Sequence, residues 1–283
     1  MSKEVKYLDW NDTNKALEEK TFEDPIAVTA DSTTLGESGK TTWYVVEDSV
    51  TISGKVTVNG DVHLILVDGK TLTTATVEIN GSLTVYGQNG QSGKLVATDP
   101  RTGEISSGYG IYVNGGLIIN GGVIEASVPN AEFGYGIYVN GALIINGGTV
   151  TATGGKTTVA ENETTGKNCC GIYVYEGDIT INGGLVTARG GKIQGEFEGY
   201  CDSHGMEVER GGITVTGGTV NATGGTVSIT NTKESQINGQ SRGIVMRSGT
   251  KLAVSGGTVT AIGSAVSVIG KNVRYGDSYG ACI

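Results

Sequence analysis

The chain has 283 residues and carries 29 acidic against 20 basic residues, for a formal net charge of −9. This balance argues against a nucleic acid or an anionic membrane surface as partner, because both require a basic surface. No stretch approaches the roughly 20 apolar residues of a membrane span, and 48 glycines beside 3 prolines exclude collagen and indicate many tight turns.

Residues 1–42 do not follow the pattern of the rest of the chain. Lys3–Leu8 is compatible with an edge strand, and Asn11–Lys20 is the one segment that favours a short helix. Stacked repeats need covered ends, because an open terminal turn exposes unpaired backbone and apolar core. We therefore predict that residues 1–42 form an N-terminal cap, with a flexible tail or linker as the alternative.

Residues 43–283 contain a repeat whose clearest unit is Gly110–Ala126, and this unit returns nearly letter for letter at Gly136–Ala152. Three weaker copies follow, at Gly171–Ala188, Gly205–Ala222 and Gly243–Ala261. Each copy has three short alternating runs bounded by Gly and Asn, which is the pattern of strands joined by tight turns. No run is long enough to bury a face alone, so the copies must stack. We predict an all-β, single-stranded, right-handed parallel β-helix of about seven turns.

The alternation also predicts which positions align between turns. The inward residues of the clearest unit are expected to be Ile111, Val113, Leu117, Ile119, Ile124 and Ala126. The second strands are expected to align at Val62, Leu83, Leu117, Leu143, Ile179, Ile213 and Leu252. Asparagine tolerates left-handed backbone and can bond along a stack, so two sets of turn residues are expected to form structural ladders. They are Asn120, Asn146 and Asn182 in one set, and Asn59, Asn80, Asn114 and Asn140 in the other.

The connection that follows the third strand varies most in length. It is short between Ala126 and Gly136 and long at 153–170 and 189–204. Insertions at one corner project from one side of a coil, and in repeat proteins that side often binds a partner. The sequence therefore predicts a binding face beside this corner.

The run WYVVEDSVTISGKVTVNGDVHLILVDGKTLTT, followed by GSLTVYGQ, resembles the opening of β-helix modules in large secreted or surface-anchored proteins of gut bacteria. More broadly, residues 43–261 resemble the pectate-lyase-like superfamily, including modules labelled carbohydrate-binding for their GGTVTA repeats. The resemblance implies an exported protein that binds a polysaccharide or a host or plant glycan. No export signal is recognisable at the start of the chain, and a chain whose signal has been removed would look the same.

Enzymes of that superfamily are the source of a second hypothesis. Its lyases use calcium held by carboxylates together with an Arg or Lys base, and its hydrolases use Asp pairs near a Gly-His-Gly. Ser203-His204-Gly205 is the only matching hint in this chain, and it lacks the accompanying motifs. His204 is therefore a candidate catalytic residue on the strength of the resemblance, with a structural role as the alternative.

Several carboxylates lie in and just after one long connection, beside His204. They are Glu196, Glu198, Asp202, Glu207 and Glu209. Glu207 and Glu209 lie two apart on one predicted strand, so both are expected to point outward with Cα atoms roughly 7 Å apart. This spacing is compatible with the acid pair of a glycosidase or with oxygen ligands for calcium. The alternative is a solvated acidic strand.

Tyrosines recur at two outward positions of consecutive turns. Tyr112, Tyr138 and Tyr173 hold one position, and Tyr109 and Tyr135 form a second pair just ahead of it. Aromatic rings along a groove can stack on sugars, and aromatic stacking between strands can also simply stabilise a sheet. In the binding interpretation Tyr112, Tyr138 and Tyr173 form the floor of a groove, 153–170 and 189–204 its wall, and Glu207 and Glu209 its acidic end.

Three functions follow from these observations. The first is a non-enzymatic, secreted or cell-surface module that binds carbohydrate, as an adhesin or stalk segment. The second is a polysaccharide lyase or hydrolase centred on His204, Glu207 and Glu209. The third is a structural spacer.

The four cysteines do not discriminate between these functions. They are Cys169, Cys170, Cys201 and Cys282. A disulfide from Cys169 or Cys170 to Cys201 is compatible with their similar places in adjacent turns. Small buried thiols are the alternative.

Overall fold

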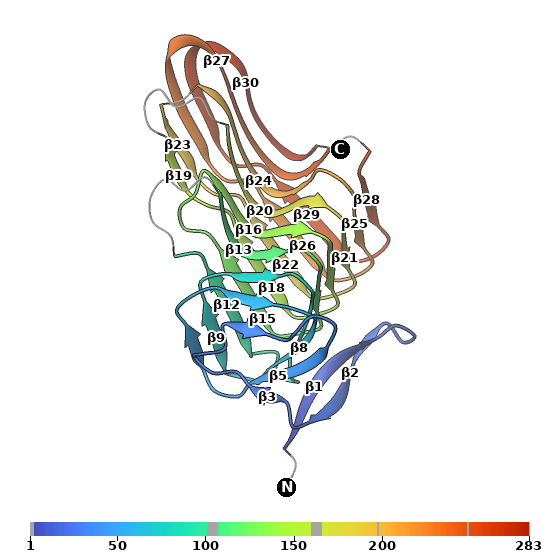
Figure 1. The fold of residues 1–283 in the computed structure, drawn as a ribbon. Helices are drawn as coiled ribbons and strands as arrows, with labels where there is room; N and C mark the ends of the chain where they lie inside the picture. The colour runs from blue at the N-terminus through green and yellow to red at the C-terminus, as the bar shows by residue number, and fades with distance from the viewer. Residues whose placement is uncertain (1–2, 101–106, 160–165, 197, 248, 283) are drawn as a thin grey trace.

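A computed structural model describes residues 3–100, 107–159, 166–196, 198–247 and 249–282. Within these ranges the chain forms strands and no helix, and all strand pairing outside an N-terminal hairpin is parallel. Figure 1 shows the strands stacked in layers along one axis, from the N-terminal end to the C-terminal end. None of the described segments is a helix that could cross a membrane. The all-β, parallel-sheet prediction is confirmed, and the arrangement is compatible with a parallel β-helix.

Consecutive strands visit three sheets in turn, which we call the first, second and third sheet after the three strands of each repeat. The main strands of the first sheet are β4 (Thr34–Leu35), β7 (Val56–Val58), β10 (Val77–Ile79), β13 (Ser107–Val113), β16 (Phe133–Asn140), β20 (Lys167–Glu176), β24 (Gly199–Val208), β27 (Val227–Met246) and β30 (Val266–Cys282). The second sheet contains β3 (Ile26–Ala27), β5 (Thr41–Val46), β8 (Asp61–Leu66), β11 (Ser82–Tyr86), β14 (Gly116–Ile119), β17 (Ala142–Ile145), β21 (Asp178–Ile181), β25 (Gly212–Val215) and β28 (Lys251–Val254). The third contains β6 (Val50–Ile52), β9 (Thr71–Thr74), β12 (Lys94–Thr98), β15 (Val123–Ser127), β18 (Thr149–Thr153), β22 (Leu185–Arg189), β26 (Thr219–Thr223) and β29 (Thr258–Ile262).

The register between turns is the one that the alternation predicts. Leu83 pairs with Val62 on one side and with Leu117 on the other, and the same column continues through all the predicted second-strand positions. The six residues predicted to point inward are each at most 1% exposed and belong to one continuous core. A strand exposes alternate residues to opposite faces, so the apolar members of every run line the inside of the coil.

A column of glycines explains how the coil closes. Gly136 begins the inward run of β16, and a Cβ placed on it would lie 2.4 Å from the backbone nitrogen of Thr153 and 2.8 Å from the carbonyl oxygen of Gly171. Gly110 meets the equivalent backbone atoms of Ser127 and Gly136 at 2.6 and 2.8 Å. The first strand of each repeat thus passes directly against the end of the third, which leaves no room for a side chain.

The helix predicted at Asn11–Lys20 is wrong, because the segment forms a hairpin. Strand β1 (Glu4–Asn11) pairs antiparallel with β2 (Ala16–Glu23), so the edge strand predicted at Lys3–Leu8 is present. The Asn11 side chain accepts hydrogen bonds from the backbone N–H groups of Thr13 and Asn14 at 2.9 and 3.1 Å, and Lys15 adopts a positive φ. Asparagine and aspartate favour such turns over helix interiors.

The hairpin packs on the outer face of the second sheet, beside the first turns of the coil (Figure 1). Tyr7 lies against Trp43 and Tyr86, and the Phe22 and Trp43 rings are stacked at 4.2 Å. The hairpin therefore covers a side of the coil. Residues 24–40 contribute β3 and β4, which pair with β5 and β7 of the first turn.

Where the structure describes them, the long connections at 153–170 and 189–204 are largely strands and do not form the predicted loop wall; residues 160–165 and 197 of these ranges lie outside the described residues. They contain β19 (Thr157–Val159) and β23 (Ile193–Glu196), which join the first sheet, and they extend β20 and β24. Figure 1 shows β27 and β30 extending in the same way, well beyond the earlier strands of that sheet. This extension has its own apolar core, which includes Ile193, Val227, Ile229 and Ile237.

Two of the cysteines help to fill this second core. Cys169 and Cys201 both belong to it, and Cys169, Cys170 and Cys201 are all buried free thiols. The disulfide considered between Cys169 or Cys170 and Cys201 is therefore not formed. Burial raises the pKa of Cys169 to about 12, so this thiol is protonated at neutral pH and acts as a small apolar side chain.

Candidate functional site

The five predicted tyrosines come together on the outer face of the first sheet. Tyr112 pairs in register with Tyr138 and Tyr138 with Tyr173, and Tyr109 pairs with Tyr135. The rings of Tyr112 and Tyr138 are stacked at 5.2 Å, and the centroids of Tyr138 and Tyr173 lie 5.3 Å apart. We call these five residues the tyrosine stack.

Stacking decides which ring faces remain open. Tyr138 lies between Tyr112 and Tyr173, so both of its faces have a ring neighbour. Tyr135 is only 6% exposed. Tyr112 lies at the end of the column, because its partner in the preceding turn is Glu78 and not another ring. Tyr112 and Tyr109 therefore form one end of the stack, and Tyr173, whose partner in the next turn is Glu207, forms the other.

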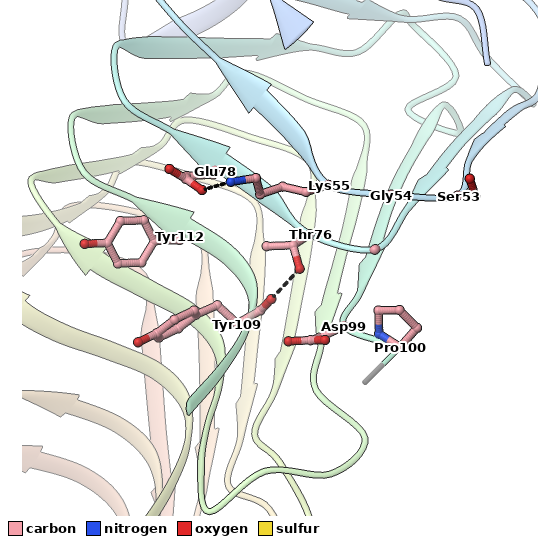
Figure 2. A pocket seen from close by; sticks show the side chains of 10 residues that line it. Ser53, Gly54, Lys55, Thr76, Glu78, Asp99, Pro100, Tyr109 and Tyr112 are labelled. Atoms are coloured by element: carbon pink, nitrogen blue, oxygen red, sulfur yellow. Dashed lines mark hydrogen bonds and ion pairs between the residues drawn. The ribbon is translucent and has the colours of Figure 1, made fainter. Parts of the chain in front are cut away.

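A pocket of about 610 Å³ opens at this end of the stack, and we call it the tyrosine-end pocket. Figure 2 shows the Tyr109 and Tyr112 rings near each other, with the Lys55–Glu78 ion pair beside Tyr112. Its other lining residues are Ser53, Gly54, Ala75, Thr76, Asp99 and Pro100. These come from connections between the third and first sheets, which is the same corner of the coil as the long connections at 153–170 and 189–204 but in earlier turns.

The pocket combines rings with polar groups and carries more acid than base. The Lys55 ammonium is 2.5 Å from a Glu78 carboxylate oxygen, and Asp99 is buried at the back. The Thr76 hydroxyl donates to the Tyr109 carbonyl oxygen at 3.1 Å, which fixes the corner beside the ring. Partial burial raises the pKa of Tyr112, so its hydroxyl remains a hydrogen-bond donor at neutral pH.

The catalytic candidates lie further along the same sheet, and two of them are not solvent-accessible. His204 and Glu207 are each 0% exposed, so Glu207 holds the predicted outward position of the strand, in register with Tyr173, but is not solvated as the alternative of an acidic surface strand requires. Arg247 covers Glu207 through an ion pair, and the Asn168 amide donates to the same carboxylate at 2.8 Å. A polymeric substrate cannot contact either side chain in this arrangement.

Glu209, unlike Glu207, is partly exposed to solvent. It is 34% exposed in its side chain and lies 3.3 Å from Arg247 Nε. The prediction that both lie on one strand is wrong, because β24 ends at Val208 and Glu209 lies just beyond it. Arg247 bridges the two carboxylates and occupies the space between them. Glu196 and Glu198 are partly buried on the preceding extension. In the part of the chain that the structure describes, no three His, Cys, Asp or Glu side chains are grouped to hold a metal ion.

Burial also sets the protonation of this cluster. Burial, with the positive charges of Arg242 and Arg247, lowers the pKa of His204 to about 4, so the ring is neutral at neutral pH. Neither ring nitrogen has a hydrogen-bond partner among the described residues. Burial disfavours ionisation of Glu207 too, but His204, Arg247 and Asn168 outweigh it and hold its pKa below the ordinary value.

The pKa of Asp202 is shifted upward, in the opposite direction to that of Glu207, and this shift leads to a prediction about stability. Burial, and then the charge of Glu207, raise its pKa from 3.8 to about 7. The folded state therefore holds this proton more tightly than the unfolded chain, so stability falls as the pH rises from about 4 through 7. We expect Asp202→Asn, which cannot ionise, to be more stable than the parent by about 2–4 kcal/mol above pH 8, and similar to it at pH 4.

Urea unfolding of both proteins at pH 4 and pH 8.5 measures this difference. Asp178→Asn is the matched control, because Asp178 is exposed and should show little change at either pH. An Asp202→Asn variant no more stable than the parent at pH 8.5 would show that Asp202 ionises freely in the folded protein.

The tyrosine-end pocket also contains residues that the sequence pattern did not predict as part of a site. Lys55, Glu78 and Asp99 belong to earlier turns and meet Tyr109 and Tyr112 only through the stacking of coils. The repeat register is the only feature of the sequence that could have identified them, because it aligns Glu78 with Tyr112 of the next turn. Comparison of the chain with known protein families, curated proteins and solved structures finds no match.

Proposed function

We propose that this chain is a non-enzymatic, exported module, secreted or displayed at a cell surface, that binds carbohydrate through the tyrosine-end pocket. In this proposal the coil is a right-handed parallel β-helix of about seven turns, with residues 1–42 protecting its first turn. The single observation that supports binding is the pocket at the open end of the tyrosine stack. At about 610 Å³ it has the size of a typical ligand site.

The chemistry of the lining favours sugars. A sugar ring has an apolar face that packs on an aromatic ring and hydroxyl groups that need hydrogen-bond partners. Tyr109 and Tyr112 offer the rings, and Glu78, Lys55 and Thr76 offer donors and acceptors around them. Neutral sugars fit better than uronic acids, because Glu78 and Asp99 are acidic and Lys55 is already paired with Glu78.

The test is retention of immobilised glycans by the parent and by single tyrosine variants. Tyr112→Ala should weaken binding about 3- to 10-fold, because it removes the open ring face, worth about 0.5–1.5 kcal/mol. Tyr173→Ala is the matched control, since Tyr173 lies at the far side of the stack from the pocket. A glycan array carrying neutral plant polysaccharides, pectins and mucin glycans identifies the ligand.

The other two functions are outcomes of the same experiment. Release of shortened products from the array glycans would support a lyase or hydrolase. Equal retention by the parent, Tyr112→Ala and Tyr109→Ala would remove the tyrosine-end pocket from the proposal. No retention of any glycan by the parent would favour a structural spacer.

A further inference from the structure

A second cavity lies on a different face of the coil, between the hairpin β1–β2 and the outer face of the second sheet. Its volume is about 500 Å³, and we call it the hairpin groove. Its floor is one outward column of the second sheet, formed by Thr84, Ile118, Ile144 and Thr180. Four adjacent strands contribute to this column, so the floor runs along the coil axis for roughly 14 Å.

A ladder of amides borders this floor. Asn120 donates to Asp9 at 2.8 Å, Asn146 to Asn120 at 2.7 Å, and Asn182 to Asn146 at 2.8 Å. Each amide uses one of its two N–H groups in the ladder. Asn120 and Asn146 are buried, and Asn182, which also accepts from the Thr216 hydroxyl at 2.7 Å, is partly exposed. The groove therefore repeats the same polar group once per strand, beside a floor whose centre is apolar.

The hairpin contributes an aromatic ring to one wall. The chain has two tryptophans, and Trp43 is enclosed by stacked contacts with Phe22 and His63 at 4.2 Å each. Trp10 has no ring contact with any described residue, is partly exposed and lines the groove. Its indole N–H donates to Asp12 at 3.0 Å, which holds the ring at the edge of the cavity. Partly exposed tryptophans at cavity edges are common binding anchors.

We infer that the hairpin groove is a second ligand site, which takes a short linear chain of neutral sugars lying along the coil axis. A linear sugar chain presents hydroxyl groups at a regular interval, which suits amides repeated once per strand. Trp10 stacks on one sugar ring, and Ile118 and Ile144 pack on the apolar faces of the others. Asp9 is paired with Lys20 at 2.7 Å and Asp12 with Lys15 at 3.3 Å, so no lysine that lines the groove is left to pair with an acidic sugar. The ligand class is that of the proposed function, but the site shares no residue with the tyrosine-end pocket.

The experiment is calorimetric titration of the whole chain with cellohexaose, xylohexaose, mannohexaose and chitohexaose. We expect at least one of them to bind, and Trp10→Ala to weaken that binding about fivefold or more, with recovery in Trp10→Phe because the ring is restored. Ile144→Lys should weaken it as well, because it fills the floor while every hairpin residue stays unchanged. Thr214→Lys is the matched control, because Thr214 continues the same column beyond the groove and is exposed.

Separate outcomes address the two sites. Loss of binding in Trp10→Ala and Ile144→Lys, but not in Tyr112→Ala, supports the hairpin groove. Loss in Tyr112→Ala alone overturns the groove and leaves the proposed function intact. Failure of all four hexasaccharides to bind the parent also overturns the groove, while retention on the broader glycan array would still support the tyrosine-end pocket. Circular dichroism of Trp10→Ala and Ile144→Lys verifies that a loss does not come from unfolding.

Discussion

Replacing Gly136 with alanine is expected to destabilise the protein by about 3 kcal/mol or more. The added Cβ would lie 2.4 Å from the Thr153 nitrogen, 2.8 Å from the Gly171 oxygen and 2.9 Å from the Ala152 carbonyl carbon. All three are backbone atoms, and Ala152 and Thr153 are held by pairing with both neighbouring turns, so these two cannot move without breaking inter-strand hydrogen bonds. Equilibrium unfolding in urea, followed by far-ultraviolet circular dichroism, measures the loss.

Gly116→Ala is the matched control for this change. A Cβ on Gly116 would have its nearest neighbour at 3.9 Å, which is an ordinary contact, and the residue paired with Gly116 in the next turn is Ala142. We expect its stability to lie within about 0.5 kcal/mol of the parent. If Gly136→Ala proves as stable as Gly116→Ala, the close approach of the first and third strands is incorrect.

Replacing Glu207 with alanine is expected to cost about 3–5 kcal/mol, because it leaves Arg247 and the buried Asn168 amide without their shared carboxylate. Glu209→Ala is the matched control, because Glu209 lies two residues after Glu207 and also pairs with Arg247. Glu209 is partly exposed and separated from Arg247 by 3.3 Å, so its loss should cost less than about 1 kcal/mol. Chemical unfolding at pH 7 compares the two variants.

The pH dependence of unfolding gives a second measure of how much Glu207 contributes to stability. Its folded pKa lies below the ordinary 4.5, so its contribution is present above pH 4.5 and is lost as the pH falls through the folded value. The parent should therefore lose stability on acidification below pH 4.5 more steeply than Glu207→Ala. Equal losses in Glu207→Ala and Glu209→Ala at pH 7 would mean that the Glu207 side chain is hydrated.

The repeat made most of the core predictable from sequence. A period of two fixes the face on which each side chain lies, and glycine and asparagine mark where strands end, so positions such as Leu117 and Leu143 align without any tertiary information. The hairpin was missed because Asn11–Lys20 contains residues compatible with a helix. In the folded protein Val5, Tyr7 and Phe22 of the hairpin pack on the second sheet, a contact that local sequence does not reveal.

The surroundings of Glu207 and of the hairpin groove were harder to predict, because they also depend on contacts between residues that are far apart in the sequence. The sequence places Glu207 on the outer face of a strand, and it does so correctly. Its burial depends on Arg247, 40 residues later, and on Asn168, 39 residues earlier. Likewise, Trp10 meets Ile144 across the hairpin groove only because the hairpin folds back along the coil. Outward positions are fixed by periodicity, but what covers them is fixed by distant side chains.

The hydrogen bonds between turns have a mechanical consequence. They run along the axis of the coil. A force that pulls its two ends apart would therefore break the hydrogen bonds of one turn at a time, beginning at an end of the coil. Each opened turn would release the contour length of its repeat. That length is 26 residues between Asn120 and Asn146 but 36 between Asn146 and Asn182, because the second interval includes a long extension. Under load, a chain built this way would lengthen in unequal steps and keep the turns beyond the opened one folded.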